Sequence, residues 1–129
     1  MLATIIMALA MLVTGTVTSL AQPEPSFRAT CSELRAAVAR LELAGDPLVT
    51  IQVEGRLTTV KSEGGLAYLI LCAQPDPRVL CVTYQENGRK PGDIVVVSGA
   101  FAQVDPDHIQ LDPCLHFLPG ESRGTGRAR

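Results

Sequence analysis

The positions of the cysteines constrain the fold of this chain more than any other feature. All four follow an apolar amino-terminal segment: Cys31, Cys72, Cys81 and Cys114. In an oxidising compartment, an even number of cysteines predicts disulfides. A zinc site needs closely spaced ligand pairs, whereas these cysteines are 41, 9 and 33 residues apart. The sequence therefore predicts two disulfides, and because it has no C-x-x-C pair it gives little support for redox chemistry.

The amino-terminal segment indicates which compartment this is. Residues 1–13 carry no charged side chain, and the small residues Ser19 and Ala21 match the preference of signal peptidases. The apolar stretch is shorter than the roughly 20 residues that span a bilayer as a helix. We therefore expect residues 1–21 to be a signal peptide and the mature protein to begin near Gln22, in the periplasm or outside the cell. No lysine or arginine precedes the apolar run, so an uncleaved anchor stays open as the alternative.

The rest of the chain has the size of one domain. Residues 22–29 contain prolines and no periodicity, which predicts a linker. Residues 30–118 are expected to form the folded domain, and its core must be built from Val, Ile and Leu because aromatic residues are few. Residues 119–129 are rich in glycine and arginine and are expected to be disordered.

The domain is predicted to begin with a short amphipathic helix at residues 30–44. Thr30 and Glu33 form a capping-box pattern, in which each side chain can satisfy a free backbone donor of the first turn. Three apolar residues then recur at helical spacing: Leu34, Val38 and Leu41. The Gly-Asp-Pro sequence at 45–47 ends the helix.

After the helix, apolar and polar residues alternate, which predicts strands. Five strands are expected, at residues 49–58, 66–72, 79–84, 94–97 and 108–112. The first strand contains Gly55, and a glycine inside a strand is typical of a bulge or a bend. The second and third strands are predicted to form an antiparallel hairpin around Asp76 and Pro77.

Five strands with a long first strand and a buried fourth strand fit the OB-fold. Five runs carry a resemblance to a known family: VEGRL at 53–57, YLIL at 68–71, LCVTY at 80–84, GDIVVVSG at 92–99 and IQLDPC at 109–114. Over about residues 49–115 the chain resembles the small exported bacterial OB-fold domains called tRNA-anti-like, a nucleic-acid-binding-like family. A cysteine in the third strand and another after the fifth are the most distinctive part of the match. The resemblance implies a mainly β protein, a five-stranded OB-fold barrel preceded by a short amphipathic helix.

The same fold leaves two disulfide connectivities open. In an OB barrel the third and fifth strands are neighbours, which brings Cys81 near Cys114 and leaves Cys31 for Cys72. The hairpin instead places Cys72 opposite Cys81, which leaves Cys31 for Cys114. The sequence does not choose between these pairings.

Residues on or beside the second and third strands are the candidate ligand contacts. OB-folds bind ligands on this face. Here it offers two tyrosines and three cations: Arg56, Lys61, Tyr68, Arg78 and Tyr84. A groove for single-stranded nucleic acid needs positive charge as well as stacking aromatics. Up to Gly120 the chain has eight Lys and Arg against twelve Asp and Glu, so its body is acidic and disfavours nucleic acid.

A cluster in and after the fifth strand raises a metal hypothesis. His108, Cys114 and His116 lie within nine residues and are ligand types that copper and zinc prefer. Against this, the predicted mature chain has no methionine for the axial position of a blue-copper site, and Cys114 is needed for a disulfide. We therefore predict no metal and no other cofactor. No serine or cysteine stands in a recognisable nucleophile motif, so no catalytic residue is predicted either.

These patterns favour an exported, non-enzymatic OB-fold binding module for a protein, peptide or glycan ligand of unknown identity. Two alternatives stay open: an extracytoplasmic module for single-stranded nucleic acid, and a metal or redox accessory protein. After cleavage of the signal, no membrane contact is expected.

Overall fold

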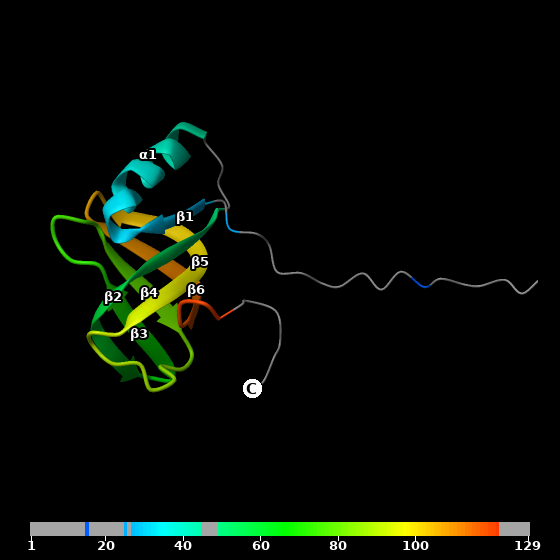
Figure 1. Cartoon of the computed structure of the whole chain (residues 1–129), viewed down its shortest axis with the longest axis vertical. Coiled ribbons are helices and arrows are strands. Elements are labelled where there is room, and N and C mark those ends of the chain that lie inside the picture. The colour runs from blue at the N-terminus through cyan, green and yellow to red at the C-terminus, as the bar shows by residue number, and fades with distance from the viewer. Residues whose placement is uncertain (1–14, 16–24, 26, 45–48, 122–129) are drawn as a thin grey trace, which may run out of the picture.

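A computed structural model describes residues 15, 25, 27–44 and 49–121 (Figure 1). The predicted signal peptide apart from Gly15, residues 22–24 and 26 of the predicted linker, and the tail beyond residue 121 lie outside the described residues. The elements, in chain order, are β1 (Phe27–Thr30), the 3₁₀ turn η1 (Cys31–Glu33), α1 (Leu34–Ala44), β2 (Thr50–Glu63), β3 (Leu66–Leu71), β4 (Arg78–Thr83), β5 (Ile94–Asp105) and β6 (His108–Phe117). Within these described ranges, no helix is long and apolar enough to cross a membrane.

Strands β2 to β6 form one closed barrel. Hydrogen-bonded neighbours follow the order β2, β3, β4, β6 and β5, and β5 then pairs with β2 over Thr50–Arg56 and Ile94–Ala100. The β4–β6 ladder is parallel and the other four ladders of the barrel are antiparallel. This is the architecture of an OB-fold, so the predicted five-stranded barrel with a short helix before it is confirmed.

The long strand β2 closes the barrel because it takes part in two ladders. Its first half pairs with β5 and its second half pairs with β3. The register with β3 shifts between Leu57 and Thr59, two residues beyond Gly55. A bulge at this place bends a strand and increases its twist, which allows a single strand to contact both neighbours.

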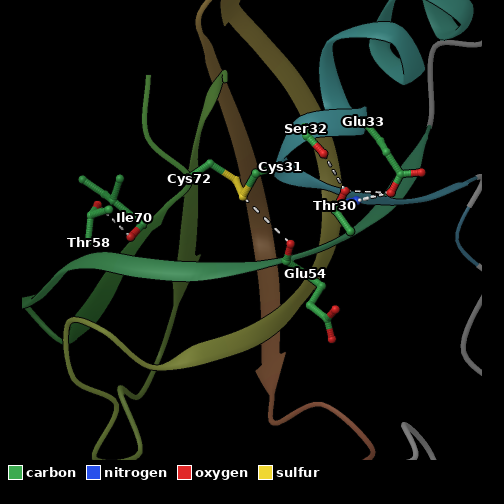
Figure 2. Close-up of a disulfide and its surroundings, with 8 residues drawn as sticks. All are labelled: Thr30, Cys31, Ser32, Glu33, Glu54, Thr58, Ile70 and Cys72. Atoms are coloured by element: carbon green, nitrogen blue, oxygen red, sulfur yellow. Dashed lines mark hydrogen bonds between the residues drawn. A yellow bond between two sulfur atoms is a disulfide. The ribbon is translucent and has the colours of Figure 1, made fainter. Parts of the chain in front are cut away.

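The helix covers one end of the barrel (Figure 1). Its residues Leu34 and Val38 are 0% and 4% exposed and belong to the aliphatic core of the barrel. The predicted cap is present, since the Thr30 backbone N–H donates to Glu33 Oε1 at 3.1 Å and the Thr30 hydroxyl donates to the same oxygen at 2.7 Å (Figure 2). The first of these bonds satisfies the free backbone donor of Thr30, the residue that precedes the first turn, and both mark where the helix begins.

Two disulfides cross-link the domain. Cys31 is bonded to Cys72 with a Cα–Cα distance of 5.5 Å, and Cys81 is bonded to Cys114 with a Cα–Cα distance of 5.4 Å. Of the two connectivities that the sequence leaves open, this is the one that follows from adjacent third and fifth strands. Disulfides of this kind are typical of proteins in an oxidising compartment.

The Cys31–Cys72 disulfide lies against β2 next to Glu54 (Figure 2), and Gly55 is the residue that leaves room for it. A Cβ on Gly55 would come 2.5 Å from Cys31 Sγ and 3.3 Å from Cys72 Sγ, so only glycine leaves room for the bridge. Cys31 Sγ is 3.9 Å from the Glu54 carbonyl oxygen. Because a bridged sulfur carries no proton, this is a packing contact. Cys72 itself has a φ of 69°, in the left-handed region that residues other than glycine rarely occupy.

A second glycine makes room at the other disulfide. Gly99 on β5 is the register partner of Cys114 on β6. A Cβ on Gly99 would lie 3.0 Å from the Cys114 Cα, and closer still to the Pro113 carbonyl oxygen. The Cys81–Cys114 bridge follows the last β4–β6 pair, Cys81 with Leu111, so it ties the two strands together where their ladder ends.

The structure adds one strand and lengthens three others. β1 pairs in parallel with β2 and includes Phe27–Ala29, which the sequence assigns to the linker. A four-residue strand with only Ala29 buried has no detectable alternation, so its partner alone defines it. β2, β5 and β6 extend to Glu63, Asp105 and Phe117. The added segments of β2 and β5 are mostly exposed, whereas the added segment of β6 pairs with the buried part of β5 and contains the buried Cys114.

Replacing Gly55 with alanine tests the packing of the first disulfide. The added methyl has no space beside Cys31 Sγ, and we expect the free energy of unfolding to fall by about 1–3 kcal/mol, as in other overpacked cores. Urea unfolding measures this loss. In a Cys31→Ala/Cys72→Ala background the sulfurs are gone, so the same substitution should cost much less. An equal loss in both backgrounds would contradict the packing described here.

Candidate ligand-binding site

The outer face of the β3–β4 hairpin is unusually apolar for a barrel exterior. Ala67, Leu69 and Leu71 point into the core, so the alternate residues of β3 face outward. The partly exposed residues of this face are Leu66, Tyr68, Ile70 and Leu80, whereas Val82 is only 8% exposed. Cross-strand pairs join Tyr68 to Val82 and Ile70 to Leu80. The face therefore offers aliphatic and aromatic surface to a ligand.

One end of this face deepens into a groove of about 510 Å³. β3 and β4 form one side of it and the β5–β6 turn forms the other. It is lined by Ile70, Arg78, Leu80, Val104, Asp105, His108, Ile109 and Gln110. Val104 is 65% exposed, which is high for a valine. A concave site of this size, with apolar walls and a few polar groups, is the usual form of a ligand site.

Backbone pairing brings the two sides of the groove together. The Arg78 N–H donates to the Asp107 carbonyl oxygen at 2.8 Å, and Arg78 is the register partner of His108 in the parallel β4–β6 ladder. The start of β4 therefore lies directly against the β5–β6 turn. Arg78 extends from this junction with an exposed side chain.

A carboxylate and an imidazole are paired within the groove. His108 Nδ1 lies 2.8 Å from both Asp105 carboxylate oxygens, and the Asp107 N–H donates to Asp105 Oδ1 at 2.8 Å. The bonds from His108 and Asp107 lower the pKa of Asp105, so this carboxylate is ionised at neutral pH. Asp105 is therefore engaged by its own turn.

Arg35 of α1 holds this turn in place. Its guanidinium donates to the Pro106 carbonyl oxygen at 3.1 Å, to the Pro75 carbonyl oxygen at 2.9 Å and to Asp107 Oδ1 at 2.9 Å. One side chain thus connects the helix, the β3–β4 connection and the β5–β6 turn. Exposed ion pairs contribute little to stability, so the value of these bonds is geometric: they set the position of one groove wall.

The structure places the sequence-predicted candidates in different surroundings. Arg78 lines the groove, whereas Arg56 donates to the Gly92 carbonyl oxygen at 2.9 Å and Lys61 pairs with Glu63 at 3.2 Å. Tyr68 is the register partner of Lys61 and is partly buried. Tyr84 follows the end of β4 and is 77% exposed. Among these candidates, the structure brings together Lys61 and Tyr68 on the hairpin face and places only Arg78 in the groove.

The three residues of the metal hypothesis do not form a site. Cys114 is bonded to Cys81 and has no thiolate to offer. His108 and His116 stand at opposite ends of β6, about 25 Å apart at the usual rise of a strand. Among the described residues, no group of three His, Cys, Asp or Glu side chains is arranged to hold a metal ion.

His116 instead anchors the β4–β5 connection. Arg89 Nε donates to His116 Nδ1 at 3.2 Å, and His116 Nε2 lies close to the Gln85 carbonyl oxygen at 2.6 Å. In this arrangement Nδ1 accepts and Nε2 donates, which is the neutral tautomer. Burial, together with the Arg89 cation, lowers the pKa of His116 below its ordinary value of 6.5, although the Gln85 carbonyl opposes this shift.

Sequence reasoning missed most of the groove. The sequence could have identified Ile70 and Leu80 as surface residues, because they alternate with the buried residues of their strands and so face outward. No sequence pattern indicates that Val104 and Arg35 contribute to the groove. The roles of these two residues depend on contacts between distant parts of the chain.

The fold and the groove together define a disulfide-linked OB-fold barrel with a candidate ligand site on its β3–β4 face. No family model matches the chain, and no curated protein matches it. Similar solved structures include a chain of the S. pombe Stn1–Ten1 complex, at 18% identity with a TM-score of 0.36 over 53% of this chain and 57% of that chain. A protein assigned as an aspartyl-tRNA synthetase from Leishmania major Friedlin is 18% identical, with a TM-score of 0.42 over 78% of this chain and 22% of that chain. This chain spans less than two thirds of either, and similarities so distant say nothing about its ligand.

The His116 contacts predict an acid-sensitive stability. Since the pKa of His116 is lower in the folded state, the unfolded chain binds a proton first as the pH falls. The contribution is complete above about pH 6.5 and is lost progressively below it. Urea unfolding between pH 5 and pH 8, roughly the range in which histidine titrates, should show a decline that His116→Gln removes. The matched variant His108→Gln should keep the decline, and its disappearance there would contradict this assignment.

Proposed function

We propose that this chain is an exported, non-enzymatic binding module that holds a protein, peptide or glycan ligand in the groove between the β3–β4 hairpin and the β5–β6 turn. The observation that carries the proposal is the groove itself, where aliphatic side chains of three elements remain open to solvent: Ile70, Leu80 and Val104. Exposed apolar surface in a concave site is typical of ligand and partner sites.

Export is supported by two independent features. The amino-terminal sequence has the pattern of a signal peptide. All four cysteines are paired in disulfides, which persist in the periplasm or outside the cell. The resemblance to the exported tRNA-anti-like domains agrees with both.

A non-enzymatic role is supported by the chemistry of the groove. An Asp–His pair serves nucleophilic catalysis when a serine, threonine or cysteine accompanies it. The described lining residues include Asp105 and His108 but no hydroxyl or thiol. The cysteines are all bridged, which also removes the main support for a metal or redox accessory protein.

Single-stranded nucleic acid is the second candidate, favoured by the exposed ring of Tyr84. A base can stack on such a ring. Charge argues against it, because two of the three predicted cations are engaged by Gly92 and Glu63. Binding to an oligonucleotide that weakens steeply with salt and depends on Tyr84 would favour this candidate over the proposal.

Export is tested on protein recovered from the periplasm of an expressing bacterium. We expect an intact mass that begins at Gln22, with four thiols becoming available to alkylation only after reduction. A retained amino terminus would support the anchor instead. Free thiols before reduction would contradict an exported, fully bridged domain.

Ligand binding is tested by selecting peptides and glycans that bind the same protein. The selected ligands are then measured against two variants, Val104→Ser and Leu115→Ser. Val104→Ser removes an exposed wall of the groove and should weaken selected ligands about tenfold. Leu115→Ser changes a residue of β6 that is 46% exposed and does not line the groove, so it should leave binding unchanged. Equal binding to wild type and both variants would show that the groove is not the site.

A further inference from the structure

The two disulfides differ in their exposure to solvent. All four cysteines lie within the described residues, and Cys31 alone among them is not buried. Cys72, Cys81 and Cys114 are each at most 4% exposed. A reductant must bring a thiolate to one of the sulfur atoms in order to attack a disulfide. The Cys31–Cys72 bridge is therefore more accessible to a reductant than the Cys81–Cys114 bridge, whose cysteines are both buried.

The backbone at Cys72 also favours opening of this bridge. Its φ of 69° lies in the left-handed region, which costs free energy for any residue with a Cβ. The bond to Cys31 is one of the constraints that hold the residue there, so opening the bridge allows Cys72 to relax. Exposed or strained disulfides are the ones that are reduced most easily and that serve regulation.

The bridge and Arg35 tie the same two segments together. Cys31 and Arg35 stand at the start of the helical segment, and Cys72 and Pro75 stand in the connection from β3 to β4. Arg35 donates to the Pro75 carbonyl oxygen at 2.9 Å, but its side chain is half-exposed, and polar contacts at exposed positions contribute little. The covalent bridge therefore fixes the spacing at which Arg35 reaches Pro75.

The same guanidinium holds one wall of the groove. Arg35 also donates to the Pro106 carbonyl oxygen and to Asp107 Oδ1 in the β5–β6 turn. Val104 and Asp105, which line the groove, directly precede these two residues. A shift in the position of Arg35 therefore displaces this wall, which connects the bridge to the ligand surface.

Opening the Cys31–Cys72 bridge leaves the rest of the barrel in place. The Cys81–Cys114 bridge still joins β4 to β6. Leu34 and Val38 remain packed in the aliphatic core and keep α1 over the barrel. The open form is therefore expected to be a folded chain in which the start of the helix and the groove wall have moved.

We propose that the Cys31–Cys72 disulfide is a redox switch for the groove, closed in the binding form and opened by a dithiol oxidoreductase. The inference rests on the proposed function and adds its regulation. The chain's own bridge is the substrate: a thiolate of the reductant attacks Cys31 Sγ, forms a mixed disulfide and releases Cys72 as a thiolate. The second thiol of the reductant then displaces Cys31. The reductant leaves as a disulfide, and its two electrons and two protons convert Cys31 and Cys72 to thiols.

The first test asks which bridge opens. The oxidised mature chain is equilibrated with rising ratios of reduced to oxidised dithiothreitol, a small dithiol, then alkylated and analysed by peptide mass. We expect a two-thiol form alkylated at Cys31 and Cys72 alone. Its amide NMR spectrum should stay dispersed, with shifted signals at Val104 and Asp105. Opening of both bridges together, or of Cys81–Cys114 first, would overturn the inference.

The second test asks whether the bridge controls binding. Ligands selected on the oxidised chain should bind the two-thiol form about tenfold more weakly, a usual size for coupling between two sites. Cys31→Ser/Cys72→Ser should bind as weakly, with or without dithiothreitol. The matched variant Arg35→Gln keeps the bridge but lacks the contacts to the turn, so reduction should lower its affinity little further. A full tenfold loss in Arg35→Gln would contradict the path through this residue.

Failure of the switch and failure of the binding function give different results. If selected ligands bind both forms equally and the groove amides do not shift on reduction, the switch is wrong and the binding function stands. If no ligand is selected, the binding function is wrong, and the amide shifts of Val104 and Asp105 on reduction still decide whether the bridge controls the groove wall.

Discussion

The Cys31–Cys72 disulfide joins the ends of β1 and β3, two strands that do not pair with each other. β1 and β5 both pair with residues 51–54 of β2, so they occupy its two opposite edges. β3 pairs with the next part of the edge of β2 that β1 occupies. Cys31 follows the end of β1 and Cys72 follows the end of β3, so their disulfide joins these two strand ends. Because Cys31 begins the η1 turn that leads into α1, the same bond fixes the start of the helix over the barrel. A bridge of this kind contributes roughly 2–4 kcal/mol, a large share of the stability of a small domain.

The groove depends on this arrangement through Arg35. The disulfide and the cap at Thr30 set the start of the helix, and the first helical turns carry Arg35 to the β3–β4 connection and the β5–β6 turn. The turn in turn holds Asp105 and His108. The candidate site therefore lies on one face of the barrel, but α1, at the end of the barrel, sets the position of one of its walls. The element that controls the geometry of the groove is separate from the surface that would contact a ligand.

The sequence predicts the fold well because the fold depends on local patterns. The capping box at Thr30, the alternation of each strand and the glycine in β2 are readable within a few residues. Its limits lie in long-range contacts. β1 is defined only by its pairing with β2. The disulfide connectivity depends on which strands are neighbours in the barrel. The groove depends on the contacts that join Arg35 to Pro75 and Asp107. Arg56 and Lys61 were sensible candidates by charge, but only the structure shows that their charges are engaged by the chain itself.

The ladder that closes the barrel also sets the order in which the chain can fold. β2 ends at Glu63, yet its closing partner begins at Ile94, and β4 meets β6 only from His108 onward. The β2–β3 pairing is available early in the chain, but the core they cover is complete only when β5 and β6 are also present. Contacts so distant in sequence make folding slow and leave strand edges open to other chains meanwhile. A truncation before β6 would remove two ladders of the barrel and one cysteine of the Cys81–Cys114 bridge at once, so β6 joins parts of the chain that are far apart in sequence.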